Sequence, residues 1–234
     1  MKMIHRIEDG YIVNIEKLEG WTSFDVVKKI KKITGFKKVG HAGTLDPFAS
    51  GVLLICIGRA TKKIKDFMDL PKQYRAVLHL GKTTNTLDKT GNFIEEKPVP
   101  KLAESEIRQI LQTFTGKIEQ KVPAYSAVKV GGRRFYSLAR QGKEVPDRFK
   151  IVHIYELRLL DYQDDRLTFE VSCSRGTYIR SLGLDIAQKM GTTGYLTELV
   201  RQSIGDYRIE DSLSIDQFSE LWAKTHNHEN FLLN

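Results

Sequence analysis

The sequence predicts an α+β fold with a central mixed, mostly antiparallel sheet flanked by helices. Strand-like and helix-like segments follow one another without the regular alternation that a Rossmann or barrel fold requires. Several strand-like segments are separated only by short turn signals, as in hairpins. The chain has 234 residues, of which 41% are apolar and 28% charged, so it can bury a full core. We expect one catalytic domain over residues 1–234, with a polar tail from about residue 223 to residue 234.

The first predicted elements are a helix and a buried strand. Thr22 or Ser23 provides a helix N-cap, and Gly35 ends the pattern. Between them, apolar residues follow helical spacing at Val26, Val27, Ile30 and Ile33. The run GVLLICIG at residues 51–58 is short, apolar and bounded by glycines, which predicts a strand buried on both faces.

The same patterns predict the later elements. In chain order they are a helix at 60–70, a strand at 73–80, a helix at 104–114, strands at 151–160 and 166–174, and a helix at 177–190. Gly131 and Gly132 follow the strand-like YSAVKV and indicate a hairpin. Asp164 and Asp165 suit a second turn, between the strands on either side of them.

Composition and motifs exclude several classes of protein. No run reaches the roughly 18 to 20 apolar residues that cross a bilayer, and the acidic start is unlike a signal peptide, so we expect a cytoplasmic protein. Cys56 and Cys173 lie in apolar runs without CxxC spacing and are expected to be buried and reduced, with no metal site. His226 and His228 resemble a metal pair, but a disordered terminus is the better interpretation.

A DKTG string around Asp88 also surrounds the phosphorylated aspartate of ion-pumping ATPases. Such pumps need several membrane helices and a much longer chain, so we expect Asp88 to organise a turn before Gly91 instead. The sequence contains no GxxxxGK(S/T), GxGxxG, HExxH or GxSxG pattern. Mononucleotide, dinucleotide, metalloprotease and hydrolase functions therefore lack support.

The formal net charge of +8 favours a polyanionic partner, either nucleic acid or an anionic surface. The densest basic segment is KKIKKITGFKK, with lysines at Lys28, Lys29, Lys31, Lys32, Lys37 and Lys38. It covers the outer face of the first predicted helix and leads into residues 40–51. A solvated helix face and a surface for RNA backbone phosphates are both compatible with this run.

The segment GHAGTLDPFASG at residues 40–51 holds one carboxylate, Asp46, in a turn with three glycines and a proline. Extended to GHAGTLDPFASGVL, it resembles the catalytic signature of the TruB family of tRNA pseudouridine synthases. Further segments resemble the family's other blocks in the same order, from about residue 10 to about residue 220: KQYRAVLHLGKTTNTLDKTG, PAYSAVKVGGRRFYSLARQGKEV, VSCSRGTYIRSLGLDIA and YLTELVRQSIG.

The resemblance implies the pseudouridine synthase fold with an active-site cleft, and isomerisation of uridine 55 in the T loop of tRNA. The reaction breaks the bond from ribose to the base nitrogen, rotates the uracil and re-forms the link at carbon 5, without metal or organic cofactor. By the same resemblance Asp46 is the essential carboxylate and Arg180 the cation that compensates it. Asp46 either attacks the sugar or uracil or removes a ribose proton, and the sequence leaves both routes open.

The target base must also be flipped out of its RNA loop. The resemblance implies that Tyr74 stacks on the flipped uracil and that its hydroxyl helps remove the proton from carbon 5. It also implies that Tyr178 and Leu199 line the pocket and that His41 contacts the RNA. Taken alone, Tyr74 and Leu199 would be core residues and Arg180 a surface charge.

Two departures from the family pattern stand out. Lys17 is followed by Leu18 where the family usually has Lys-Pro, and the chain ends before there is room for a C-terminal RNA-binding domain of the PUA type. We therefore expect a monomer whose catalytic domain alone contacts the T arm and elbow of tRNA. The rival interpretation is a non-catalytic RNA module that refolds the tRNA elbow, and Asp46→Asn separates the two because it removes only the chemistry.

Overall fold

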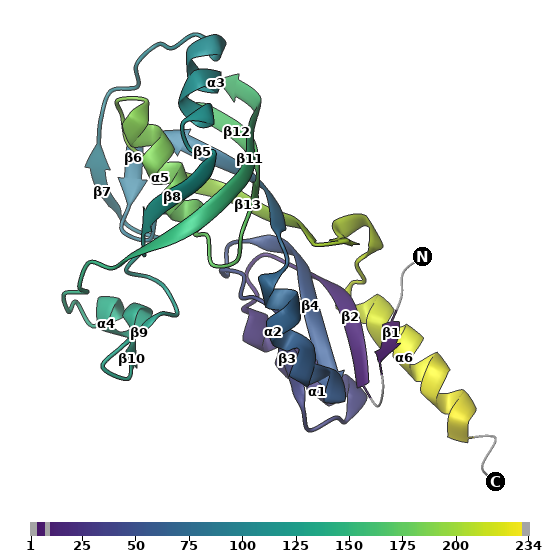
Figure 1. Ribbon diagram of the computed structural model, residues 1–234. Helices are drawn as coiled ribbons and strands as arrows, with labels where there is room; N and C mark the ends of the chain where they lie inside the picture. Colours follow the sequence, from purple (N-terminus) through teal and green to yellow (C-terminus); the bar gives the residue numbers. More distant parts are fainter. Residues whose placement is uncertain (1–3, 8–9, 231–234) are drawn as a thin grey trace. The chain divides into compact units, whose positions relative to one another are not determined.

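The computed structural model describes residues 4–7 and 10–230, with side chains up to residue 225 (Figure 1). The chain divides into two units, and each is described by itself. Unit 1 consists of the described parts of Met1–Gln73 and Val200–Asn234, and unit 2 consists of Tyr74–Leu199.

The sheet of unit 1 is built around β4 (Ser50–Gly58), whose residues are buried from Gly51 to Ile57, as the apolar run predicts. β2 (Gly10–Lys17) lies antiparallel along the whole of β4. The remaining strands are β1 (Ile4–Ile7), antiparallel to β2, β3 (Val39–His41), antiparallel to β4, the end of β13 (Gly194–Ile204), parallel to β4, and β14 (Tyr207–Arg208), antiparallel to β13.

Helix α1 (Ser23–Thr34) begins and ends where the sequence predicts. The Thr22 hydroxyl accepts a hydrogen bond from the Asp25 backbone N–H at 3.1 Å, and the Asp25 carboxylate accepts one from the Thr22 N–H at 3.0 Å. These two bonds satisfy backbone donors that a helix start leaves without partners. Gly35 takes the left-handed conformation, with φ of 73°, and closes the helix.

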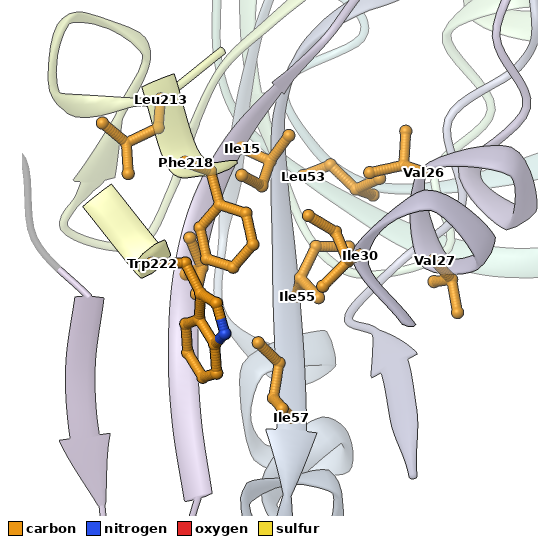
Figure 2. Packing of buried hydrophobic residues seen from close by; sticks show 11 residues of the cluster. Ile15, Val26, Val27, Ile30, Leu53, Ile55, Ile57, Leu213, Phe218 and Trp222 are labelled. Atoms are coloured by element: carbon orange, nitrogen blue, oxygen red, sulfur yellow. The ribbon is translucent and has the colours of Figure 1, made fainter. Parts of the chain in front are cut away.

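The main core of unit 1 lies between β2, β4 and the helices α1 and α6 (Ile215–Asn230) (Figure 2). Alternate residues of β4 point to opposite faces, so one face supplies this core and the other packs against different side chains. Full burial of each large apolar side chain contributes roughly 1.5–3 kcal/mol. The central members are Ile15, Val26, Val27, Ile30, Leu53, Ile55, Ile57, Leu213, Phe218 and Trp222.

The end of the chain corrects one expectation. Residues 223–230, predicted to belong to a polar tail, continue helix α6 to Asn230. Packing of Phe218 and Trp222 fixes the first turns, and a helix that has started extends readily into polar sequence. The backbone at His226 and His228 is therefore helical rather than disordered, while their side chains and residues 231–234 lie outside the described residues.

Unit 2 contains strands in the order β13-β5-β12-β11-β8. Asp164, with φ of 54°, and Asp165 form the predicted turn between β11 and β12, which pair antiparallel. The bounds are Lys72–Leu80 for β5, Gly116–Lys121 for β8, Phe149–Gln163 for β11, Arg166–Cys173 for β12, Glu104–Gln112 for α3 and Ile179–Lys189 for α5.

Two small hairpins complete unit 2. Gly131 and Gly132 join β9 (Lys129–Val130) to β10 (Arg133–Arg134), which confirms the hairpin signal. Helix α4 (Phe135–Arg140) follows directly. The second hairpin pairs β6 (Lys82–Thr84) with β7 (Phe93–Glu96).

The predicted α+β class with a mixed, mostly antiparallel sheet is confirmed. The helix expected at 60–70 is a short 3-10 turn, Arg59–Lys63, followed by α2 (Ile64–Asp69). That the two units act as one catalytic domain stays a prediction. Among the described residues, no helix is both long enough and apolar enough to cross a membrane.

Candidate active site

Asp46 lies in the loop between β3 and β4 of unit 1, and this loop is tied to itself. The Ala42 N–H donates to the Leu54 carbonyl at 2.9 Å, and the Ala49 N–H donates to the Asp46 carbonyl at 3.1 Å. The second bond closes a tight turn that contains the proline. Asp46 itself is half-buried, so its carboxylate is carried on a fixed backbone at the edge of the core.

The start of α1 holds the same loop from outside. The Ser23 hydroxyl accepts a hydrogen bond from the Leu45 N–H at 2.9 Å and lies 3.3 Å from the Leu45 carbonyl, to which it donates. Ser23 and Leu45 are both buried. The residue before Asp46 is therefore fixed by a buried side chain.

Arg201 of β13 binds both ends of the loop. Its side chain is 1% exposed; Nε donates to the Val52 carbonyl at 2.7 Å and Nη2 to the Gly43 carbonyl at 3.1 Å. The planar guanidinium suits this double contact because its donors have a fixed separation. Gly51 has φ of 105°, and a Cβ there would lie 2.3 Å from the Arg201 carbonyl oxygen, so only glycine fits where the two strands meet.

Lys17 is a second buried cation in unit 1. Its ammonium donates to the carbonyls of Leu18 at 3.0 Å and Trp21 at 2.7 Å. Burial lowers the pKa of Lys17 to about 8, the negative charge of Asp46 acts to raise it, and Arg201 lowers it further. Asp46 is thus within electrostatic range of a buried ammonium from its own unit.

The turn after Lys17 forms without the proline that the family usually has. The two carbonyl contacts of the Lys17 ammonium close it, and the Leu18 side chain is 58% exposed. The Gly20 N–H then donates to the Pro47 carbonyl at 2.8 Å. The turn is therefore also bonded to the residue that follows Asp46.

His41, at the end of β3, is half-buried. Burial and the nearby Arg201 charge lower the pKa of His41 below its usual value, while a hydrogen bond with the Gly43 backbone opposes them. The imidazole is therefore neutral at pH 7. A neutral imidazole suits a hydrogen bond rather than an ion pair with an anion, and contact of His41 with RNA stays a prediction.

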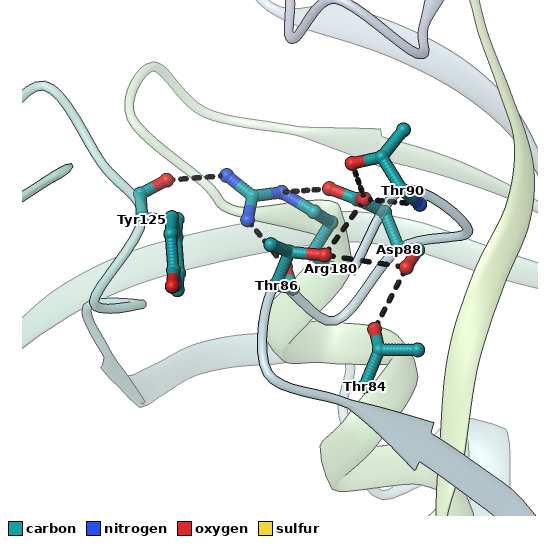
Figure 3. A network of polar contacts seen from close by, with 6 residues as sticks. All are labelled: Thr84, Thr86, Asp88, Thr90, Tyr125 and Arg180. Atoms are coloured by element: carbon teal, nitrogen blue, oxygen red, sulfur yellow. Dashed lines mark hydrogen bonds and ion pairs between the residues drawn. The ribbon is translucent and has the colours of Figure 1, made fainter. Parts of the chain in front are cut away.

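Arg180 lies near the start of α5 in unit 2 and is 3% exposed. Nη1 donates to the Thr86 carbonyl at 2.6 Å and Nη2 to the Tyr125 carbonyl at 2.9 Å, while Nε lies 3.8 Å from Asp88 Oδ2 (Figure 3). Such a buried, well-bonded guanidinium is not an ordinary surface charge.

Asp88 links the Arg180 guanidinium to the turn in which Asp88 itself lies. Its Oδ1 accepts hydrogen bonds from the Thr86 hydroxyl at 2.8 Å, the Thr90 N–H at 2.9 Å and the Thr90 hydroxyl at 2.5 Å (Figure 3). The prediction that Asp88 organises a turn is confirmed. Leu87 takes the strained left-handed conformation, with φ of 63°.

The other predicted site residues lie in unit 2. Tyr74, on β5, is 8% exposed, and Leu199, on β13, is 5% exposed. Tyr178 is half-buried and immediately precedes α5. Asp46 and His41 belong to unit 1 and these three residues and Arg180 to unit 2, so the pairing of Asp46 with Arg180 stays a prediction.

The lysines of residues 28–38 are all exposed, on α1 and the segment after it. Their contact with RNA stays a prediction. A second basic surface was not anticipated: the β9-β10 hairpin with α4 exposes Lys129, Arg133, Arg134, Arg140 and Lys143. The guanidinium carbons of Arg134 and Arg140 lie 5.9 Å and 5.7 Å from the centre of the Tyr136 ring.

Metal binding has no candidate group in the part of the chain that the structure describes, where no three His, Cys, Asp or Glu side chains come together suitably. Cys56 and Cys173 are both buried thiols and form no disulfide within the described residues, as predicted. Burial raises the pKa of Cys56 to about 12, which keeps it an unreactive thiol.

Sequence reasoning missed the contacts of Arg201 with the loop, the burial of Lys17 and the pairing of Asp88 with Arg180. The signal for the first is that Arg201 directly follows two apolar residues, Leu199 and Val200, and an arginine buried beside them needs hydrogen-bond partners. The other two gave only weak signals, since their partners come from turns whose geometry the sequence does not show.

The chain is similar to known proteins over most of its length. Residues 31–179 match a family model described as "TruB family pseudouridylate synthase (N terminal domain)". The chain is 43% identical over 225 residues to tRNA pseudouridine synthase B of Caldanaerobacter subterraneus subsp. tengcongensis, a match covering 96% of this chain and 79% of that protein. It is 42% identical over 219 residues to tRNA pseudouridine synthase B of Phocaeicola vulgatus, covering 91% and 93%.

Among solved structures, the chain is similar to the one described as "Crystal Structure of a Cbf5-Nop10-Gar1 Complex", with a TM-score of 0.71 and 29% identity. That match covers 91% of this chain and 54% of the solved chain, so this chain spans about half its length.

Proposed function

The chain belongs to the TruB family of pseudouridine synthases, and from this membership we propose that it modifies uridine 55 in the T loop with Asp46 as the essential carboxylate. The isomerisation of uridine to pseudouridine in tRNA is the activity of the enzyme. One observation carries the assignment of Asp46. Its loop is held by the Arg201 fork at Gly43 and Val52, with the Lys17 ammonium in electrostatic range.

The reaction needs a carboxylate that does not move. The bond between ribose and the base nitrogen breaks, the uracil rotates, carbon 5 bonds to the ribose, and the proton of carbon 5 is lost as the freed nitrogen gains one. Asp46 serves either as the nucleophile or as the base that removes a ribose proton. Both routes gain from a charged group whose position is fixed before substrate binds.

Arg180 supplies the compensating positive charge in this proposal. Support comes from three of its partners, the carbonyls of Thr86 and Tyr125 and the carboxylate of Asp88, which fix the guanidinium before substrate binds. Lysine could not make the same set of contacts, because it lacks the planar fork. Asp88 has the role of orienting Arg180.

Three apolar or aromatic residues are proposed to receive the flipped uracil: Tyr74, Tyr178 and Leu199. Stacking of a base on an aromatic ring returns roughly 1–3 kcal/mol toward the cost of flipping. The Tyr74 hydroxyl is proposed to help remove the proton of carbon 5. His41, neutral at pH 7, is proposed to hydrogen-bond the opened RNA loop.

The proposed partner surface for tRNA is basic. The exposed lysines of α1 and the exposed arginines of the β9-β10 hairpin both offer contacts for backbone phosphates of the T arm. A monomeric state and a cytoplasmic location belong to the same proposal.

The experiment incubates purified protein with an unmodified tRNA transcript, without added metal, and maps pseudouridine by carbodiimide-dependent primer-extension stops. We expect one stop, at position 55, and none in a matched transcript with cytidine there. A stop at another position would contradict the assignment of uridine 55. Pseudouridine formed by Asp46→Asn would contradict the assignment of the carboxylate.

A further inference from the structure

Two side chains that no part of the proposed mechanism uses converge on Tyr178. Gln120 of β8 and Lys150 of β11 lie directly opposite each other in an antiparallel pair. The Gln120 side chain bonds the backbone of Tyr178, and the Lys150 ammonium lies over the Tyr178 ring. All three residues belong to unit 2.

Gln120 bonds the Tyr178 backbone in both directions. Its Nε2 donates to the Tyr178 carbonyl at 3.1 Å, and its Oε1 accepts from the Tyr178 N–H at 2.8 Å. Gln120 is 0% exposed, and a buried amide is tolerated only when its donors and acceptors are used. Tyr178 is the N-cap of α5 and makes no side-chain capping bond, so Gln120 fixes the residue where the helix begins.

Lys150 covers the ring. Its ammonium lies 3.8 Å from the centre of the Tyr178 ring and donates to the Gly176 carbonyl. Gly176 has φ of 80°, and a Cβ built there would lie 3.3 Å from the ammonium, so glycine permits both the turn and the approach of the lysine. An ammonium over a tyrosine face is attracted by the ring electrons, more strongly when partly desolvated.

We propose that Gln120 and Lys150 form a clamp that positions the Tyr178 ring, and with it the start of α5, for binding the flipped uracil. The inference rests on the proposed function, from which it takes the role of Tyr178. Gln120 and Lys150 are positioning residues, since they act through Tyr178. A further hydrogen bond joins β8 to the start of α5: the hydroxyl of Ser181, which is next to Arg180, donates to the Lys121 carbonyl at 2.9 Å.

The clamp has its own pH dependence. Burial lowers the pKa of Lys150 to about 8, with Cys173 on β12 acting in the opposite direction. Among the described residues, Cys173 is the titratable group that acts on the ammonium, the Tyr178 ring lies against it, and Gln120 on β8 carries no charge. As pH rises through about 8, Lys150 loses its proton and the attraction to the ring is lost.

The test compares Lys150→Met, Lys150→Arg, Gln120→Met and the double methionine variant under single-turnover conditions. Lys117→Met is the matched control, an exposed lysine on β8. We expect each single methionine variant at the clamp to slow pseudouridine formation roughly 3- to 30-fold, with tRNA Kd changed less than about twofold. Lys150→Arg should restore most of the rate, and the double variant should lose less than the product of the single losses.

Rates of pseudouridine formation between about pH 7 and pH 9 distinguish a positioning role of Lys150 from a role in folding. The Tm of each variant shows whether it is folded. Between about pH 7 and pH 9 the wild-type rate should decline more than the rate of Lys150→Arg, because arginine keeps its charge while Lys17, whose pKa is also about 8, titrates in both proteins. Identical pH profiles, a wild-type rate for Lys150→Met, or loss of tRNA affinity in step with rate would each overturn the clamp. Failure of the proposed function looks different: Asp46→Asn would then stay active whatever the Lys150 variants do.

Discussion

Arg180 illustrates the cost of burying a charged residue. Its guanidinium is 3% exposed and its described ionic partner, Asp88, is 5% exposed. Removing one member of such a pair takes away part of the compensation of the other buried charge, which is costly at low exposure. Asp88→Asn keeps the size of the side chain, so its effect reports the lost charge.

We predict that Asp88→Asn lowers the free energy of unfolding by about 2–4 kcal/mol, measured by urea denaturation. The rate of pseudouridine formation should fall as well, because Arg180 loses a partner that orients it. Asp161→Asn, at an exposed aspartate on β11, is the control and should change stability by less than about 0.5 kcal/mol. Equal stability of the two variants would contradict a buried pair.

At the scale of residues, the sequence identifies the residues proposed for the chemistry better than the residues that hold them in place. Asp46 and Arg180 are recognisable because each lies in a short motif of characteristic residues. The contact of Arg201 with Gly43 joins residues far apart in the chain, and the sequence does not show which carbonyl a buried arginine will reach. For the same reason the Gln120 and Lys150 contacts with Tyr178 emerge only from the strand register.

At the scale of elements, the approach of β4 to β13 determines how the Asp46 loop ends. Gly51 lies opposite Arg201, and the space for a side chain at this position is filled by the Arg201 backbone. We predict that Gly51→Ala destabilises the protein by at least about 2 kcal/mol more than Gly116→Ala, measured by urea denaturation.

Gly116 is a matched control because its φ of 100° is close to the 105° of Gly51, but nothing lies within 4 Å of a Cβ there. The difference between the variants therefore isolates the clash from the backbone strain. Equal destabilisation would mean that the two strands can separate locally at no cost, and the loop would then lack the rigidity assigned to it.

Local signals explain which elements the sequence predicts. The caps Thr22 and Gly35 define α1, and the continuous apolar run defines β4, because these signals lie within the element. No prediction was made for β2 or β13, since their role follows from pairing with β4. The polar end of α6 has no apolar spacing of its own and extends a helix fixed by packing earlier in the element.

At the scale of the whole molecule, the net charge of +8 favours association with a polyanion such as tRNA. We predict that reversing Lys31, Lys32, Lys37 and Lys38 to glutamate weakens tRNA binding and reduces the slope of log Kd against log salt by up to about 3. Filter binding over a salt series measures both. The loss should shrink at high salt, where phosphate contacts contribute less.

A second fourfold variant controls for net charge: Lys101, Lys117, Lys189 and Lys224, all exposed, reversed to glutamate. It changes the total charge equally at other places. If both variants weaken binding to the same extent, the lysines around α1 form a solvated face with no particular role.

The fold class of the whole molecule was predictable because the order of hairpins and helices can be read from local sequence patterns. The division into two units depends on long-range contacts, which those patterns do not show.

The most direct test of the account is the single-turnover rate of pseudouridine formation by Asp46→Asn, measured beside its tRNA Kd. The replacement keeps the size of the side chain and removes its charge, so the loop and the RNA contacts should survive. We predict no detectable product and a Kd within about threefold of wild type. Product formed at a rate near that of the wild type would contradict the account, and so would loss of tRNA binding in step with loss of activity.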